Sequence, residues 1–370
     1  MSAVFVQPVR LVARAVGNLD LFLLVVLLAL MGIGLAVLHS AGADGGALMR
    51  SQAARFGVGL VILAVLSRIS PVRLRTWTPW LFAGSLLLLM AVPIVGTGGS
   101  GRRWLYLGAF YLQPSELMKL TVPMMVAWVL HRAALPPRLP TLVQCAAVIG
   151  VPVVLIVMQP DLGTGLLIGL SGAFAVYLAG LSWWYMGAGA LAAAAAGVLM
   201  WMFGLREYQK NRLLTFVDPE RDPLGTGWNI LQSKIAVGSG GPTGKGWGQS
   251  TQAHLDFLPE QTTDFAFAVL AEEFGWIGVC LVLLLFVVVL ARCLWIASQA
   301  RDSYARLLAG ALAMTALMYV LVNGGMVAGL LPVVGAPMPL VSYGGTSAVS
   351  ILAGFGIIMS VHAHKRFIGG

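Results

Sequence analysis

The sequence predicts an all-α integral membrane protein, a single polytopic domain over residues 1–370 with about ten transmembrane helices. Hydrophobic residues make up 59% of the chain and charged residues only 10%, whereas a soluble domain has about 25% charged residues. The apolar residues form runs that approach the roughly 20 residues needed to cross a bilayer. The basic residues lie in short clusters between these runs, as membrane topology requires. We therefore expect membrane lipids, and no nucleic acid, around the chain.

The first apolar run could be mistaken for a signal peptide, because Arg10 and Arg14 precede it. It extends over about 18 residues, however, and a signal peptide has an apolar region of roughly 7–15. We interpret it as an uncleaved first helix. The expected spans are 20–39, 53–67, 77–96, 114–133, 141–158, 163–181, 183–204, 264–291, 305–330 and 343–363.

Ten spans place both termini on one side, and the basic residues indicate which side it is. The short loops opposite the termini hold only Arg50, Arg55, Arg102 and Arg103. Because basic residues collect on the cytoplasmic side, both termini are predicted to be cytoplasmic. Loop 205–263 is then a large extracytoplasmic loop between helices 7 and 8, and loops 97–113, 159–162 and 331–342 face outward with it. On the side of the termini lie Arg10, Arg14, Arg68, Arg73, Arg75, Arg132, Arg138, Arg292, Arg301, Arg306, Lys365 and Arg366.

Two charged residues lie near the start of the fourth span, in QPSELMKL. A charge inside the bilayer costs about 2.5–3.5 kcal/mol on insertion scales, so such residues are functional candidates. Glu116 and Lys119 are spaced i, i+3 and share a helix face. They form either a salt bridge that only neutralises two charges or a polar wall of an outward cavity, and both descriptions can hold together.

Acidic residues are concentrated in EQTTDFAFAVLAEEFG, residues 260–275, which holds four of the 14 in the chain. Asp264 opens the eighth span, where it is either a helix N-cap or a carboxylate at the rim of an outward cavity, able to act as a general base. Glu272 lies about 12 Å further along a helix, so Glu272 and Glu273 must pair, protonate or face water. Asp161, in the turn QPDLGTG, has the same two interpretations as Asp264: a cap or a functional group.

The Gly-rich part of the long loop, GSGGPTGKGWGQ, resembles a phosphate-binding loop in composition. It lacks the GxxxxGK[ST] spacing and is predicted to face outward, which argues against a nucleotide site. Its backbone N–H groups, with Lys245 and Arg212, could hold a pyrophosphate from outside.

Together these segments resemble the SEDS family of bacterial membrane glycosyltransferases, and the compact length looks like the RodA branch of the family. The resemblance covers essentially the whole chain. It is carried by GSGRRWLYLGAFYLQPSELMKL (99–120), QPDLGT (159–164), QSKIAVGSGGPTGKGWGQSTQAHLDFLPEQTTDFAFAVLAEEFG (232–275) and PMPLVSYGGTS (337–347).

The resemblance implies polymerisation of lipid II, an undecaprenyl-pyrophosphate-linked disaccharide-pentapeptide, at the outer face of the bacterial cytoplasmic (inner) membrane. Asp264 matches the essential acidic residue of the family and is implied to be the general base. A class B penicillin-binding protein is implied as the partner. The sequence requires no cofactor, although a divalent cation, Mg²⁺ or Mn²⁺, could assist the departing pyrophosphate; no ligand cluster predicts its position.

The remaining motif residues are implied to contact the substrate, and other functions stay open beside the polymerase. A lipid II flippase would move the lipid without joining sugars, a division polymerase would belong to the same family, and a scaffold would tolerate loss of Asp264. The residues expected to bind substrate are Glu116, Lys119, Arg102, Arg103, Asp161, Arg212, Lys245 and Ser342.

Overall fold

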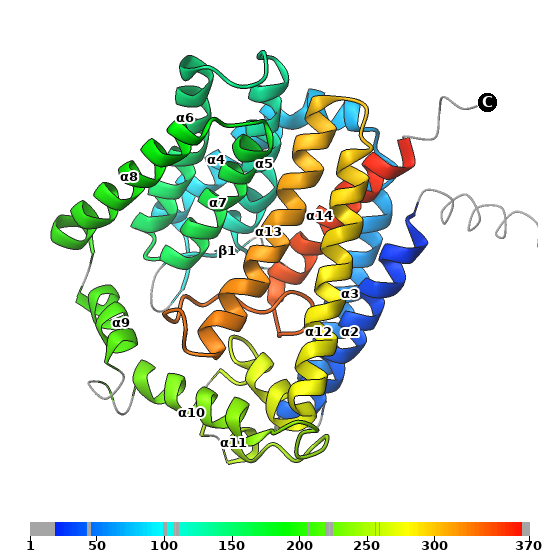
Figure 1. The fold of residues 1–370 in the computed structure, drawn as a ribbon, viewed down its shortest axis with the longest axis vertical. Coiled ribbons are helices and arrows are strands. Elements are labelled where there is room, and N and C mark those ends of the chain that lie inside the picture. Colours follow the sequence, from blue (N-terminus) through cyan, green and yellow to red (C-terminus); the bar gives the residue numbers. More distant parts are fainter. Residues whose placement is uncertain are drawn as a thin grey trace, which may run out of the picture.

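The computed structural model describes residues 19–42, 46–98, 102–106, 108, 111–205, 207–218, 222, 225–255, 257–258 and 260–364. Within these ranges the chain forms a helical bundle with one short antiparallel ribbon of two strands, β1 (Leu105–Tyr106) and β2 (Tyr111–Leu112) (Figure 1). Among the basic residues used to predict sidedness, four lie outside the described residues: Arg10, Arg14, Lys365 and Arg366.

Each of the ten predicted spans coincides with a helix in the described part of the chain. Eight of these helices are long and apolar enough to cross a membrane, which makes this a multi-pass membrane protein. The other two are α5, which carries Glu116 and Lys119, and α7, which has 17 residues. The helices are α2 (Leu21–Ala41), α3 (Ala47–Leu66), α4 (Pro71–Val95), α5 (Pro114–His131), α6 (Leu139–Met158), α7 (Leu162–Leu178), α8 (Trp183–Leu199) continued by the π-helical turn η1 (Met200–Gly204), α12 (Ala266–Ser298), α13 (Ser303–Val327) and α14 (Gly345–Ala363).

Short polar side chains define where several of these helices begin. Asp20 accepts a hydrogen bond from Leu23 N at 3.0 Å at the start of α2, and Asp302 accepts one from Ala305 N at 2.6 Å at the start of α13. Ser70 precedes Pro71, which occupies the first position of α4. These residues satisfy N–H groups that a helix leaves free at its start.

The described chain begins and ends at the same end of the bundle. Asp20 lies 2.7 Å from Arg292 Nη2 and 3.8 Å from His362 Nε2, near the end of α14. This agrees with an even number of crossings. At the opposite end, Trp247 of the long loop donates a hydrogen bond to Ala36 O of α2 at 3.0 Å. Which end faces the cytoplasm stays a prediction.

Helix α14 lies inside the bundle between α3 and α13 (Figure 1). Glycines allow its close contact with α3: a Cβ on Gly59 would lie 2.4 Å from Leu352, and one on Gly356 would lie 2.8 Å from the backbone of Leu63. Small residues commonly permit such approaches between membrane helices. Helix α8 is the opposite case, because none of its residues is buried and it stands apart from the bundle (Figure 1).

The long loop and the eighth span differ from the sequence prediction. The described part of loop 205–263 contains three helices, α9 (Glu207–Val217), α10 (Thr226–Ser239) and α11 (Thr251–His254). The eighth span, predicted over 264–291, is α12, which continues to Ser298 and is broken at Gly275, with φ 61° and ψ −161°. A Cβ at Gly275 would lie 2.3 Å from Gly244 N of the Gly-rich loop, so only glycine fits this contact.

Candidate functional site

A cavity of about 900 Å³ lies at the end of the bundle that holds the long loop. Its walls come from α5, α7, α9, α10, the turn before α12 and the loop between α13 and α14. The loops predicted to face outward together therefore do meet around one space. The polar and charged lining residues are Arg103, Gln113, Glu116, Lys119, Asp161, Thr164, Gln209, Arg212, Asn229, Glu260, Thr263, Asp264, Tyr319, Thr346 and Ser347.

Glu116 and Lys119 form a buried ion pair in the wall of this cavity, with Lys119 Nζ 2.7 Å from Glu116 Oε1. Ser350 of α14 donates a hydrogen bond to Glu116 Oε2 at 2.6 Å, and Lys119 donates one to Ser347 at 3.4 Å. The salt bridge and the polar wall are thus both present. The pair adds no net charge to the cavity wall, because the two charges neutralise each other.

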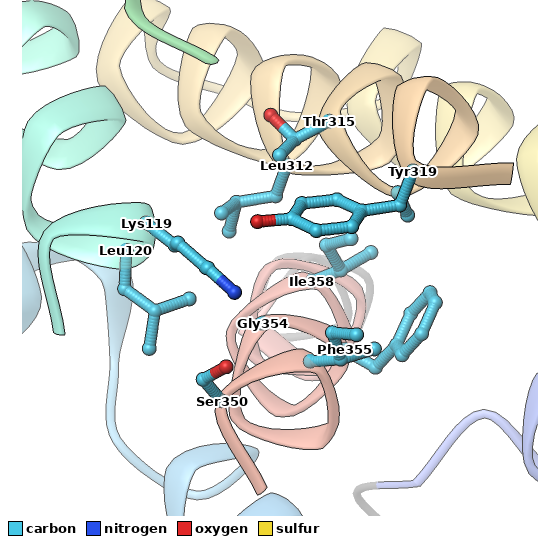
Figure 2. A pocket seen from close by; sticks show the side chains of 11 residues that line it. Lys119, Leu120, Leu312, Thr315, Tyr319, Ser350, Gly354, Phe355 and Ile358 are labelled. Atoms are coloured by element: carbon cyan, nitrogen blue, oxygen red, sulfur yellow. The ribbon is translucent and has the colours of Figure 1, made fainter. Parts of the chain in front are cut away.

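A second, much smaller cavity of about 40 Å³ adjoins Lys119 between α5, α13 and α14 (Figure 2). Lys119 and Tyr319 both extend into it and also line the large cavity. The Tyr319 ring lies 4.8 Å from Lys119 Nζ, and within the described chain its buried hydroxyl has no hydrogen-bond partner. Most of the other side chains that line this small cavity are apolar, among them Leu120, Leu312 and Phe355, so Lys119 and Tyr319 lie where the charged cavity meets the apolar interior of the bundle.

Asp264 lies on a tight turn, residues 260–265, that precedes α12. The carbonyl of Glu260 accepts hydrogen bonds from Thr263 N at 3.1 Å and Phe265 N at 3.2 Å, and Glu260 itself has φ 58°. The N-cap interpretation of Asp264 is wrong, because α12 begins at Ala266, its cap residue is Phe265, and no side chain caps it. The carboxylate is therefore free for another role.

The surroundings of Asp264 raise the pKa of its carboxyl group from the ordinary 3.8 to about 6. Burial is the main cause, the negative charges of Glu260 and Asp161 add to it, and the positive charge of Arg212 opposes it. Within the described part of the chain, no hydrogen bond or ion pair involves this carboxylate. Among the described residues Asp264 thus has an unpaired carboxylate whose pKa is raised toward neutral pH, which makes it a stronger base than an ordinary aspartate.

Asp161 has the capping role that the sequence allowed and also lines the cavity. Its Oδ1 accepts a hydrogen bond from Thr164 N at 3.2 Å at the start of α7. Arg103 lies beside it, with 3.8 Å between Arg103 Nη1 and Asp161 Oδ2, and donates to Pro160 O at 2.6 Å. Arg212 reaches the cavity from α9. The two arginines thus present positive charge to the same space as Asp264.

Three of the residues expected to bind substrate do not line the cavity. Arg102 donates a hydrogen bond to Pro93 O at 3.0 Å, and Ser342 accepts one from Met338 N at 3.0 Å. Lys245 lies 2.5 Å from Glu272 and is not brought together with Arg212. These contacts give all three residues structural partners.

Glu272 and Glu273 fasten the Gly-rich loop to the first part of α12. Glu272 accepts hydrogen bonds from the hydroxyl groups of Ser250 at 2.5 Å and Thr251 at 2.8 Å, as well as from Lys245. Glu273 accepts one from the Ser40 hydroxyl group of α2 and one from Gly248 N at 3.2 Å. Of the three outcomes expected for these carboxylates, Glu272 shows pairing with a cation, whereas in the described chain Glu273 is held by hydrogen bonds, among them those from Ser40 and Gly248.

Several cavity residues were not singled out from the sequence. Glu260 belongs to the acidic stretch 260–275 but no role was predicted for it, and Gln209, Asn229 and Tyr319 lie outside the motifs. In the described ranges, no group of three or more His, Cys, Asp or Glu residues is arranged to hold a metal ion.

The fold and the site together define a polytopic membrane protein with a charged cavity that opens among its loops. The profile of the FTSW_RODA_SPOVE family, described as cell cycle protein, matches residues 18–367. The chain therefore belongs to this family.

Individual relatives agree with the family match over nearly the full length. Peptidoglycan glycosyltransferase MrdB of Escherichia coli K12 is 44% identical over 352 residues, which cover 95% of each chain. A chain from a structure that describes the coordination of polymerization and crosslinking by a peptidoglycan synthase complex is 32% identical. It has a TM-score of 0.83 and covers 94% of this chain and 99% of that one. The rod shape determining protein RodA of Thermus thermophilus has a TM-score of 0.72 at 29% identity, covering 95% of this chain and 98% of its own.

Proposed function

We propose that the protein is a peptidoglycan glycosyltransferase that polymerises lipid II into glycan strands at the outer face of the bacterial cytoplasmic membrane, for cell elongation. The enzyme class follows from a relative that bears this name, is 44% identical and matches 95% of the chain. The observation that carries the mechanism is the Asp264 carboxylate, which has no partner among the described residues and a pKa raised to about 6, in a cavity of about 900 Å³.

The proposed reaction is a single inverting displacement. The C4 hydroxyl oxygen of an incoming lipid II attacks the anomeric carbon of the growing chain, the bond to undecaprenyl pyrophosphate breaks, and Asp264 takes the hydroxyl proton. A base is most effective when its pKa lies near the working pH, and Asp264 approaches this condition. Inverting glycosidases need a second carboxyl as an acid. Here pyrophosphate leaves as a stable anion, so one carboxylate suffices.

Cationic side chains in the cavity are the proposed partners of the pyrophosphate groups. Arg103 and Arg212 offer planar guanidinium groups, which bind phosphate oxygens with two parallel hydrogen bonds. Lys119 contributes less free charge, because Glu116 already neutralises it. We assign Glu116 and Lys119 to shaping the cavity wall and Asp161 to holding Arg103. No step is assigned to a divalent cation.

The proposal includes a partner that cross-links the product, a class B penicillin-binding protein. Its support is the similarity to a chain of a peptidoglycan synthase complex in which polymerization and crosslinking are coordinated. A transpeptidase that acts on new strands would need to lie on the same side of the membrane as the cavity.

The test is polymerisation of lipid II by the purified protein, alone and with its penicillin-binding protein carrying an inactivated transpeptidase site. Wild type is compared with Asp264→Asn, which keeps the shape and loses the basicity. Asp302→Asn is the matched control, because Asp302 caps α13 at the other end of the bundle and asparagine also caps helices. We expect long glycan strands from wild type and the control, and none from Asp264→Asn.

Two outcomes would contradict the proposal. Equal activity of Asp264→Asn and wild type would remove Asp264 from the chemistry. Absence of product in every combination, with lipid II moved across vesicle membranes instead, would favour a flippase.

A further inference from the structure

Asn323 is a fully buried side chain on α13, 0% exposed, and it connects two segments that line the cavity. Its amide nitrogen donates one hydrogen bond to the carbonyl oxygen of Asp264 and another to the carbonyl oxygen of Ala336, each at 2.8 Å. Both partners are carbonyl oxygens, which only accept, so the nitrogen of the amide must face them. Asn323 itself does not line the cavity.

The two segments that Asn323 joins have no ladder of backbone hydrogen bonds to fix them. Asp264 lies in the turn before α12, and Ala336 lies in the irregular loop between α13 and α14. Buried backbone carbonyls outside helices and sheets need a partner from elsewhere. Asn323 supplies that partner from near the C-terminal end of α13, a helix of 25 residues.

The same contact determines how the carboxylate of Asp264 lies against the loop. Asp264 Oδ2 is 3.7 Å from the position that a Cβ on Gly335 would take, and Gly335 has φ 71°. Tyr343 N adds one more link, a hydrogen bond to Thr262 O at 2.8 Å. The turn and the loop thus lie against each other, and the side chain of Asn323 contacts the turn at Asp264 and the loop at Ala336.

We propose that Asn323 is a positioning residue for the glycosyl transfer, which holds the backbone of Asp264 so that its carboxylate faces the acceptor hydroxyl. The inference rests on the proposed role of Asp264 as the base. Asn323 acts through the main chain and touches no substrate. Its loss lowers the rate of the chemical step and leaves lipid II binding nearly intact.

A purely structural role would give a different result. If Asn323 only stabilised the fold, its loss would lower the amount of folded protein, and the folded remainder would react at the normal rate with the normal pH dependence. If it positions Asp264, the turn loosens and the carboxyl becomes better hydrated. Because burial is the main cause of the raised pKa of Asp264, the pH of half-maximal activity then moves down.

The experiment compares wild type with Asn323→Leu and Asn323→Ala, both of which lack the amide nitrogen that donates to the two carbonyl oxygens. Thr78→Val is the matched control: Thr78 is fully buried, and its hydroxyl lies 2.7 Å from that of Tyr304 near the other end of α13. Initial rates of lipid II polymerisation are measured against lipid II concentration and pH, per mole of protein that remains folded in detergent. Asp264→Asn is measured in parallel.

We expect kcat to fall about 100-fold in both Asn323 variants, as small misplacements of a reacting group do, with KM within about twofold of wild type. The pH of half-maximal activity is expected to fall, and Thr78→Val to match wild type. Should Asn323→Leu fail to fold, Asn323→Ala carries the same test. If the Asn323 variants show unchanged kcat and pH profile per folded molecule while Asp264→Asn is inactive, the inference about Asn323 is overturned. If Asp264→Asn is itself active, the proposed base is refuted instead.

Discussion

Replacing Asp264 with asparagine is expected to make the protein more stable at neutral pH while it removes activity. The rise in the pKa of the carboxyl group from 3.8 to about 6 corresponds to about 3 kcal/mol of unfavourable free energy in the ionised folded state. The side chain is half-buried, so solvent screening reduces the expected gain to about 1–2 kcal/mol. Asparagine keeps the shape and carries no charge, so it avoids this penalty.

The sign of the pH dependence follows from the direction of the shift. The folded state binds a proton at Asp264 more tightly than the unfolded state, so wild type loses stability as pH rises from about 4 to about 6. Asp264→Asn has no carboxyl group at this position, so it does not lose stability in this way as the pH rises. The two proteins should therefore unfold alike near pH 4 and differ fully above about pH 6.

Thermal unfolding of both proteins in the same detergent at pH 4 and pH 7.5 tests this reasoning. At the higher pH we expect the midpoint of Asp264→Asn to lie about 2–8 °C above wild type, since each 1 kcal/mol moves the midpoint of a large domain by about 2–4 °C. Asp302→Asn, whose parent carboxylate is a helix cap, should show no such gain. A midpoint for Asp264→Asn at or below wild type at pH 7.5 would refute the assignment of a desolvated carboxylate.

Three further changes test other parts of the structure. Glu116→Ala should abolish polymerisation and leave membrane insertion intact. It leaves Lys119 buried without its partner, at a cost of about 3–5 kcal/mol of folding free energy. A double variant in which both residues are neutral should therefore regain stability in a melting assay but not activity. Gly275→Ala should lower the unfolding midpoint and the rate together, because a left-handed backbone costs about 1–3 kcal/mol and the added Cβ meets the backbone of the Gly-rich loop. Lys245→Met should destabilise the protein, because it leaves the buried Glu272 carboxylate without a cation, yet it should leave KM for lipid II unchanged. A large rise in KM would instead support the pyrophosphate role expected from the sequence.

The existence and order of the membrane helices could be predicted from the sequence, because each is a long apolar run bounded by polar residues. The limits of such predictions are clear at α12. The pattern of apolar residues continues smoothly through Gly275, and the break there arises from contact with Gly244, 31 positions earlier in the chain. Periodicity reports a local preference and contains no information on such a long-range contact.

The composition of the site was partly predictable for a related reason. Glu116, Lys119 and Asp264 lie at or within apolar runs, where a charge is costly enough to require a purpose. Lys245 lies in a glycine-rich loop that resembles a phosphate-binding loop in composition, but its ammonium group is taken by Glu272. Asn323, within an apolar helix, carries no charge to attract notice, and its importance depends on two carbonyl oxygens that the sequence cannot place.

The groups that surround each carboxylate, and not its position within an apolar run, decide which one can serve as a base. Glu116 is held by Lys119 and Ser350, and Glu272 by Lys245 and two hydroxyl groups. A proton taken up by either would first have to displace a cation. Asp264 has backbone contacts that fix its position and no partner, within the described chain, that quenches its charge. Fixed position combined with an unpaired charge is what a general base requires, and among these three carboxylates only Asp264 meets both conditions.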